Sequence, residues 1–356
     1  MAVPQQRDPD ITRRRLAEWC STHVAGGAGV TVGALTAPPG AGFANETLVF
    51  EAAWANRTRR MVARIATPSY QVYPTSRLAE EAKVMTTLRD HSEVPVPRVY
   101  GYEPDPEPLG GPFLVMGYVP GRVPADFPSY HRKGWVAELS EQDRAVLWDN
   151  GIATMSLVHK VRPTALGLAM VDGNWWESQF RSYAEQLDFF RSADSPVVLA
   201  ALEWLRDNRP DDSLPSGLLW GDARLGNILF DHVTPTAVLD WEMVSHGPAE
   251  VDLGWFLYLD RHLSAGIGAT RLAGLPGRAA TITRYAELLG RAVADLTFYE
   301  VFAGLRLALV AARVTELVVA NGIAGPDFPL RRNTTRLLER TLNDAERPPS
   351  SAGSAA

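Results

Sequence analysis

Apolar residues recur at helical spacing in the stretch "SRLAEEAKVMTTLRD". They stand at Leu78, Ala82, Met85 and Leu88. Repeats of three and four residues place side chains on one face of an α-helix, so the pattern predicts a helix with these residues turned inward. Glu81 falls beside the inward stripe, whereas Glu80 and Lys83 point elsewhere.

Shorter apolar stretches on both sides of this helix are typical of β-strands. Residues 30–36 and 47–54 are separated by "APPGAGFAN", and "WANRTRRMVARIA" then gives a turn and a third strand. Two more strands follow the helix, around 97–102 and 112–119, divided by the turn-rich "EPDPEPLGG". The first third of the chain therefore predicts an antiparallel sheet of about five strands with one main helix.

Helical patterns dominate the rest of the chain. Ser140 and Asp143 resemble a capping box, which predicts the start of a helix running to about Lys160. Further helical patterns cover about 174–192, 195–208, 276–290, 294–320 and 332–345. We predict an α+β fold with an N-terminal lobe at 1–119, a mostly helical C-terminal lobe at 120–345 and a disordered tail at 346–356.

The composition is that of an ordinary globular chain. Of 356 residues, 46% are hydrophobic and 21% are charged, which excludes bulk disorder. A net charge of −6 lacks the basic surface of a general nucleic-acid binder. The single cysteine, Cys20, excludes an internal disulfide and a cysteine-built zinc site. The N-terminal residues lack the apolar segment of a secretory signal and residues 301–320 are interrupted by charges, so we expect a cytoplasmic protein without a membrane partner.

The segment "GDARLGNILFDHVTPTAVLDWE" places polar residues beside two short apolar strands. With strands at 228–230 and 237–239 and a six-residue turn between them, the simplest hairpin register sets Asn227 opposite Asp240. An amide and a carboxylate are oxygen ligands of the kind that Mg²⁺ prefers. Asp222 lies five residues before Asn227 and would face that metal across the loop.

This spacing is typical of kinases. In these enzymes a catalytic-loop Asp accepts the substrate proton, an Asn five residues later binds metal, and a later Asp bridges metal and phosphates. Asp222, Asn227 and Asp240 take those places. Each alone would be an ordinary turn residue or strand-end cap, because Asp and Asn populate turns for backbone reasons. The joint spacing favours chemistry.

"GDARLGNILF" followed by "VLDWEMVSHGPAEVDLGWFL" resembles the aminoglycoside phosphotransferase and choline kinase superfamily. The signature of that superfamily is His-Gly-Asp, four residues, Asn, and then a strand carrying Ile-Asp-Trp/Phe-Glu. The resemblance extends from about Val30 to about Arg313. The chain is most similar to the kinase domains that accompany acyl-CoA dehydrogenases, whose motif order it shares in "GFANETLVF", "EEAKVM", "VPVPRVYGY", "GGPFLVMGYVPGRV" and "DLGWFL". The resemblance implies a bilobal protein-kinase-like fold and an ATP- and Mg²⁺-dependent kinase that phosphorylates a hydroxyl of a small molecule.

The resemblance also implies roles for individual residues. Asp222 would be the catalytic base, and Asn227 and Asp240 would bind the metal. Arg224 lies between the base and the first metal ligand and would steady the transferring phosphoryl group. A solvated loop arginine explains Arg224 equally well.

A further set of positions would bind the nucleotide. "GAGFANET", with Gly42, Phe43 and Asn45, stands where a phosphate-covering loop belongs, but it does not fit G-x-G-x-x-G and a plain hairpin loop explains it equally well. "FLVMGYVPG" resembles the hinge that contacts adenine, which would place Met116 and Tyr118 at the ring. A connecting strand would look the same.

Two positions depart from the pattern. Arg64 stands where kinases carry a strand lysine that binds the α and β phosphates and pairs with a helix glutamate, here Glu81. The alternative is a solvent-facing arginine in a surface ion pair. Trp220 stands where the signature has His and would brace the loop by packing. Both changes also fit a catalytically silent nucleotide-binding scaffold, which is the alternative to a kinase.

Two acceptor classes remain open. A cationic, aminoglycoside-like amine would suit the acidic residues after the metal aspartate: Glu242, Glu250, Asp252 and Asp260. A hydrophobic hydroxyacyl compound would suit the aromatic residues of the same lobe: Trp175, Trp176, Trp255 and Tyr258. We expect Asp252 to brace the catalytic loop, and His159 to be a buried histidine bonded to backbone.

Overall fold

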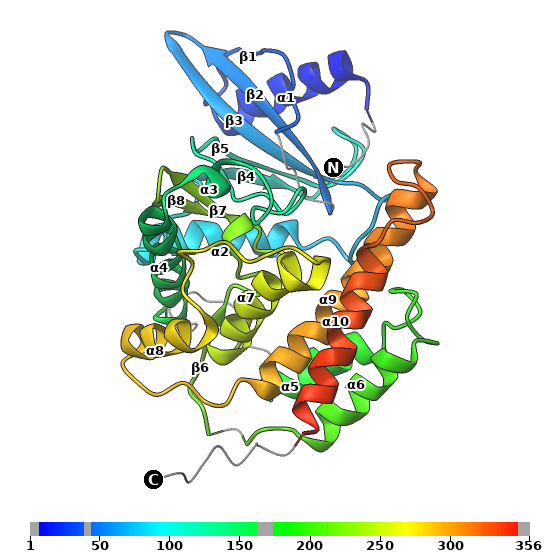
Figure 1. Ribbon diagram of the computed structural model, residues 1–356. Helices are drawn as coiled ribbons and strands as arrows, with labels where there is room; N and C mark the ends of the chain where they lie inside the picture. Colours follow the sequence, from blue (N-terminus) through cyan, green and yellow to red (C-terminus); the bar gives the residue numbers. More distant parts are fainter. Residues whose placement is uncertain (1–6, 39–43, 162–173, 212, 348–356) are drawn as a thin grey trace.

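The computed structural model describes residues 7–38, 44–161, 174–211 and 213–347. Figure 1 shows a β-sheet with a helix on each side at one end of the molecule, and a larger helical part beneath it. The α+β class predicted from the sequence is confirmed. Gly42, Phe43 and residues 348–356 of the predicted tail lie outside the described residues.

Five antiparallel strands form the N-terminal sheet in the order β1-β2-β3-β5-β4. Their bounds are β1 (Thr31–Val32), β2 (Asn45–Trp54), β3 (Arg57–Ala66), β4 (Val99–Glu103) and β5 (Phe113–Gly117). β2 and β3 form a continuous ladder that starts at Asn45 opposite Ala66. β1 is shorter than the predicted 30–36, and Thr36 forms only an isolated bridge to Val49.

The two faces of the sheet pack against different helices. Met61 belongs to the cluster formed with α1 (Pro9–His23), and Val62 to the cluster formed with α2 (Leu78–His91). Side chains alternate across a strand, so Arg64 leaves β3 on the same face as Val62. This alternation turns Arg64 toward α2.

Eight helices of the described chain build the C-terminal part. They are α3 (Trp135–Glu138), α4 (Glu141–His159), α5 (Trp175–Ala184), α6 (Pro196–Asp207), α7 (Glu250–Leu263), α8 (Arg278–Leu289), α9 (Thr297–Ala320) and α10 (Leu330–Ala345). Ser140 caps α4 by accepting a hydrogen bond from the Asp143 N–H at 3.0 Å, as the sequence predicted. α5 is shorter than the predicted 174–192.

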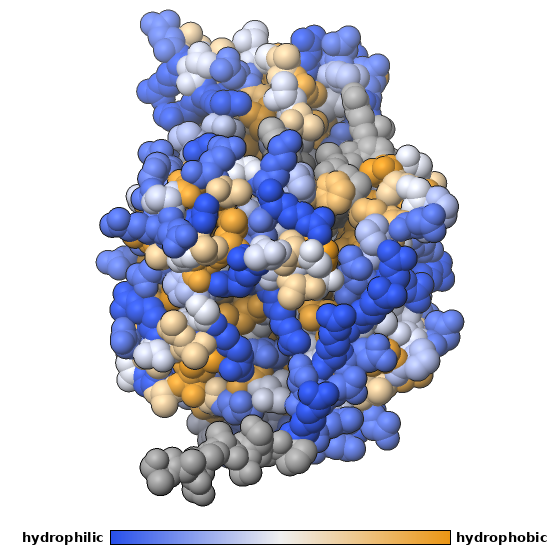
Figure 2. Space-filling model, viewed as in Figure 1, coloured by the Kyte–Doolittle hydropathy of each residue, from blue (hydrophilic) through white to orange (hydrophobic). Residues whose placement is uncertain are grey.

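Helices α7 and α9 form the centre of the helical part. α7 is buried around nearly its whole circumference, as expected of a helix that packs on every side. α9 is a packed helix, as predicted, and carries Arg306 into the core. In the part of the chain that the structure describes, no helix is both long and apolar enough to span a bilayer. Figure 2 shows a mainly polar surface on one face, with apolar side chains scattered among polar ones.

The hairpin that follows the predicted catalytic loop differs from the prediction. β7 (Ile228–Asp231) and β8 (Thr234–Val238) are joined by a two-residue turn, whereas the sequence predicted six. Two-residue hairpin turns favour positive φ, and His232 adopts a φ of 54°. A bulge between Leu229 and Phe230 shifts the register. The Leu239 N–H therefore donates to the Asn227 carbonyl at 2.8 Å, so the prediction that Asn227 faces Asp240 was wrong by one residue.

Burial of His262 on α7 predicts an acid-sensitive contribution to stability. Desolvation lowers the pKa of His262 from 6.5 to about 4, and its Nδ1 has no hydrogen-bond partner among the described residues. Between these pKa values the folded state therefore binds fewer protons than the unfolded state. The contribution of neutral His262 to the unfolding free energy is complete above pH 6.5 and decreases as the pH falls toward 4. Between pH 7 and pH 5 we expect wild type to lose about 2 kcal/mol more unfolding free energy than His262→Asn.

Urea unfolding of both proteins at the two pH values measures this difference. Parallel losses in wild type and His262→Asn would contradict the assignment.

Candidate active site

A buried loop between β6 (Ser216–Leu219) and β7 carries the predicted catalytic residues. Asp252 on α7 holds this loop by accepting hydrogen bonds from the Trp220 N–H at 2.7 Å and the Gly221 N–H at 3.0 Å. The predicted bracing role of Asp252 is confirmed. His159 bonds to Asp252 at 2.9 Å through Nε2 and to the Tyr285 hydroxyl through Nδ1. The expectation that His159 bonds to backbone was wrong, because two buried side chains satisfy both ring nitrogens.

Gly221 allows the loop to approach the next segment closely. It adopts a φ of 89°, and a Cβ there would collide with the carbonyl of Met243. Arg306 donates from Nη2 to the Gly221 carbonyl at 2.8 Å. The backbone immediately before Asp222 is therefore fixed from two sides.

Three donors orient the carboxylate of Asp222. Trp255 Nε1 donates to Oδ1 at 2.8 Å, and Asn227 Nδ2 donates to Oδ2 at 2.6 Å. Arg224 Nε also donates to Oδ2, at 3.0 Å. A carboxylate offers about four acceptor sites, so one remains for a further hydroxyl donor.

Arg224 lies between two carboxylates. Besides Asp222, it forms an ion pair with Asp126, a residue of the connection between the two parts of the molecule. Burial acts to lower the pKa of Arg224, but Asp126 and Asp222 raise it above its usual value. Gly226 leaves room for this contact, because a Cβ there would lie 2.9 Å from Asp126 Oδ1. Sequence reasoning missed Asp126, since 98 residues separate the partners and no local motif marks it.

Arg64 connects the sheet to the helical part. Its Nη1 donates to Glu81 Oε2 at 2.6 Å, so the ion pair predicted from the sequence is present. Its Nη2 donates to Asp240 at 3.0 Å and lies 3.9 Å from Glu242. The side chain of Arg64 is 11% exposed, which excludes a solvent-facing arginine.

The carboxylates around Arg64 could hold a metal ion. Oxygen atoms of Glu81, Asp240 and Glu242 lie within 4.8 Å of one another, and Mg²⁺ prefers such oxygen ligands. Burial raises the pKa of Glu81 to about 7, with Arg64 opposing and Asp240 adding to the rise. Glu81 Oε1 is buried without a hydrogen-bond partner among the described residues. The carboxylates thus form an electron-rich, incompletely satisfied cluster that fits a divalent cation.

The two predicted metal ligands are neighbours through the hairpin. Asn227 lies in a short 3₁₀ helix, Leu225–Asn227, and is bonded through its carbonyl to Leu239, the residue before Asp240. Asp240 adopts a φ of 61°, in the left-handed region. The amide nitrogen of Asn227 is engaged by Asp222, which leaves its oxygen as the group that would face a cation.

The predicted adenine contacts lie at the end of β5. Met116 is buried in the core and pairs with Val62 and Val99 on the two neighbouring strands. The Tyr118 N–H donates to the Arg60 carbonyl at 3.1 Å, and the Arg60 guanidinium lies 3.9 Å from the centre of the Tyr118 ring. The amide N–H of Tyr118 is therefore already engaged. Of the three named candidates Gly42, Phe43 and Asn45, only Asn45 is among the described residues; it begins β2 and is buried.

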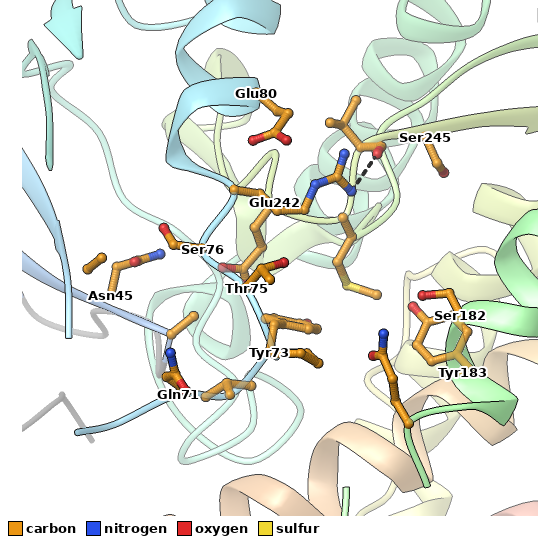
Figure 3. A pocket seen from close by; sticks show the side chains of 18 of the residues that line it. Asn45, Gln71, Tyr73, Thr75, Ser76, Glu80, Ser182, Tyr183, Glu242 and Ser245 are labelled. Carbon is orange, nitrogen blue, oxygen red and sulfur yellow. Dashed lines mark hydrogen bonds between the residues drawn. The ribbon is translucent and has the colours of Figure 1, made fainter. Parts of the chain in front are cut away.

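A cavity of about 700 Å³ adjoins the carboxylate cluster of Glu81, Asp240 and Glu242. Figure 3 shows that Tyr73 and Thr75 from the connection between β3 and α2 and Tyr183 from α5 face it, together with Glu242. Burial, Glu242 and Asp222 raise the pKa of Tyr73 well above its usual value. Met243 also lines the cavity, and its carbonyl lies against Gly221, the residue before Asp222. The cavity therefore lies beside the catalytic loop.

The cavity is not lined as the sequence predicted. Of the four acidic candidates, only Glu242 lines it. Glu250 pairs with Arg291, and Asp260 pairs with Arg271, each at 2.6 Å. The four aromatic candidates are core residues and do not line it either: Trp175, Trp176, Trp255 and Tyr258. The local sequence does not show whether an aromatic residue lines the cavity or lies in the core. It also does not show whether an acidic residue is already paired with an arginine.

Trp220 stands at the position of the signature histidine and stabilises the loop by a hydrogen bond as well as by packing. It is fully buried, and its Nε1 donates to the Leu239 carbonyl at 2.9 Å.

Trp220→Phe keeps most of the packing but leaves that carbonyl without its donor, so we expect a loss of about 2 kcal/mol in unfolding free energy. Urea unfolding measures it, with Trp54→Phe at the half-buried end of β2 as the control. Equal losses in both variants would contradict the bracing role.

The sequence matches a known family over most of its length. Residues 37–288 match the family described as "Phosphotransferase enzyme family". The Arabidopsis thaliana protein named "Probable acyl-CoA dehydrogenase IBR3" is 26% identical over 311 residues, covering 80% of this chain and 37% of that protein. The human "Acyl-CoA dehydrogenase family member 11" is 29% identical over 166 residues, covering 46% of this chain and 20% of that protein. The chain spans less than half the length of these relatives.

Solved structures share the fold. A Ralstonia eutropha structure, provisionally described as an aminoglycoside phosphotransferase, aligns with a TM-score of 0.71 at 23% identity, covering 93% of this chain and 97% of that chain. A thermostable mutant of aminoglycoside phosphotransferase APH(4)-Ia, in a ternary complex with ADP and hygromycin B, aligns with a TM-score of 0.58 at 14% identity, covering 94% and 99%. The family match, the curated relatives and these folds confirm the resemblance drawn from the motifs. The chain belongs to the phosphotransferase enzyme family.

Proposed function

We propose that this chain is an ATP- and Mg²⁺-dependent kinase that transfers the γ-phosphate to a hydroxyl of a small molecule. One observation carries the proposal: Arg64 of the sheet, paired with Glu81, bonds to Asp240 of the helical part across 176 residues of sequence. Phosphoryl transfer needs groups that position and neutralise phosphates next to a base that accepts the hydroxyl proton. Arg64 is a group of the first kind, Asp240 would act on the phosphates through a bound Mg²⁺, and Asp222 is the base.

Asp222 accepts the proton of the acceptor hydroxyl. Its carboxylate is oriented by Trp255, Asn227 and Arg224, and its one remaining acceptor site is available to the hydroxyl. Proximity and orientation of this kind lower the entropic part of the barrier. Arg224 serves first to orient Asp222, and any contact of Arg224 with the phosphoryl group uses the N–H groups left over from its two ion pairs.

Asn227 and Asp240 would hold Mg²⁺, with Glu242 as a neighbouring carboxylate. When bound, the ion supplies positive charge against the phosphate oxygens. Arg64 binds the α and β phosphates and keeps its orientation through Glu81. In this proposal Gly42, Phe43 and Asn45 cover the phosphates, and Met116 and Tyr118 border the adenine. A cytoplasmic location, where ATP and Mg²⁺ are plentiful, fits this activity.

Calorimetry and a transfer assay test the proposal together. ATP binding to wild type is measured with and without Mg²⁺, and ADP release is measured with aminoglycosides, choline-like amines, sugars and hydroxyacyl thioesters. We expect ATP binding that depends on Mg²⁺ and ADP release above the acceptor-free rate with at least one of these classes. Binding of ATP without transfer to any of them would favour the nucleotide-binding scaffold instead.

A further inference from the structure

A buried arginine lies behind the wall of the cavity. Arg306 on α9 is 2% exposed, and its guanidinium lies 4.5 Å from the centre of the Trp255 ring. Its Nη2 donates to the Gly221 carbonyl, and its Nε donates to the Tyr183 hydroxyl at 3.2 Å. Within the described ranges, no carboxylate forms an ion pair with Arg306. Its charge is therefore met by oxygen atoms and ring faces.

This contact fixes the hydrogen-bonding direction of Tyr183. A guanidinium has only donors, so the Tyr183 oxygen must accept from Arg306, and its own O–H is left to donate elsewhere. Tyr183 is half-buried and lines the 700 Å³ cavity. Figure 3 shows it on the wall formed by α5, next to Ser182. A cationic partner also makes a hydroxyl a stronger donor.

The charges around the cavity do not favour a cationic guest. The charged side chains in its lining are two acids, Glu80 and Glu242, and two bases, Arg77 and Lys83. Glu242 already lies 3.9 Å from Arg64. A guest with several ammonium groups would need carboxylates that this wall does not offer, and an ammonium group facing Tyr183 would meet a donor backed by a guanidinium.

We propose that Tyr183, directed by Arg306, is a specificity-determining residue that donates a hydrogen bond to a carbonyl-type oxygen of the acceptor. The acceptor is then an alcohol that carries such an oxygen and has no ammonium group at that position. The inference rests on the proposed function in treating the cavity as the acceptor site. Arg306 bonds both to the Tyr183 hydroxyl and to the carbonyl of Gly221, the residue before Asp222, so an alcohol bound at Tyr183 lies next to the catalytic loop.

Three alcohols of equal chain length test the inference. N-butanoylethanolamine carries the carbonyl, N-butylethanolamine carries an ammonium group, and heptan-1-ol carries neither. Their binding to wild type, to Tyr183→Phe and to the control Tyr100→Phe on β4 is measured by ligand-observed NMR titration without nucleotide. Thermal unfolding of each protein confirms that it is folded.

We expect wild type and Tyr100→Phe to bind N-butanoylethanolamine about tenfold more tightly than the other two alcohols, the size of one good hydrogen bond. In Tyr183→Phe this preference over heptan-1-ol should disappear, because only the carbonyl compound loses a partner. Removing the Tyr183 hydroxyl from the protein, the carbonyl from the ligand, and then both, isolates the contact between these two groups. The inference is overturned if wild type binds the ammonium compound as tightly, if Tyr183→Phe keeps the preference, or if none of the alcohols binds.

The transfer assay is kept separate from this titration. Selective binding of the carbonyl compound without ADP release would retain the inference about the wall and refute the kinase. ADP release with an ammonium alcohol alone would refute the inference and retain the kinase.

Discussion

Asp222→Ala is expected to reduce the kcat for phosphoryl transfer about 100- to 10,000-fold, the usual contribution of a positioned general base. ATP affinity should change by less than about twofold, because no phosphate or metal ligand of the proposed site is removed. The expected loss of kcat follows from the Asp222 carboxylate, which three donors hold in one orientation. Steady-state ADP release gives kcat, and calorimetry with Mg²⁺ gives the ATP affinity.

Removing Asp222 also leaves its three donors without their acceptor, so folding must be checked in the same variant. Thermal unfolding provides that check. Asp149→Ala is the matched control, since Asp149 is a half-exposed carboxylate on α4 that pairs with Arg284. A folded Asp222→Ala protein that retains wild-type kcat would remove Asp222 from the reaction.

Asp240→Ala is expected to weaken Mg²⁺-dependent ATP binding about 100-fold or more, comparable with the loss of a metal's supporting ligand. Asp240 is a predicted metal ligand and also the partner of Arg64 at 3.0 Å. Its loss removes a ligand and leaves Arg64 with fewer anionic partners, so the effect of Mg²⁺ on ATP binding should largely vanish.

Calorimetry with Mg²⁺ and with EDTA measures this dependence. Wild type should lose affinity in EDTA, while Asp240→Ala should be nearly indifferent to it. Glu80→Ala is the matched control, because Glu80 is an exposed acid that lines the same cavity outside the carboxylate cluster. An Asp240→Ala protein that shows the wild-type response to Mg²⁺ would place the metal elsewhere.

Elements governed by local periodicity were predicted well. The sheet, α2, α4 and α9 follow from repeats of two, three and four residues or from a cap, because each residue's burial is set by its position along one element. The pairing of Arg64 with Glu81 was also predictable, since strand alternation and the helix stripe turn both inward. The short β6 and β9 (Ser245–Pro248) pair was not, because each strand has only four residues and little periodicity.

Within the candidate site, too, the local spacing was predictable from the sequence and the hairpin register was not. The five-residue spacing from Asp222 to Asn227 is local, and the Asn227 amide does bond to the Asp222 carboxylate at 2.6 Å. The register that relates Asn227 to Asp240 depends on a bulge and a tight turn, which small differences in backbone energy select and the apolar pattern does not record.

The sequence by itself determined the fold class, the family and the order of the polar residues along the loop. Only the tertiary structure decided that Asp126 meets Arg224, that Arg64 reaches Asp240, and that Arg306 donates to the hydroxyl of Tyr183 on the cavity wall. The physical reason is that each such contact joins single side chains from distant segments. A single buried charge leaves no repeat in the sequence, and its partner is chosen by the packing of whole elements and by the cost of leaving it unpaired.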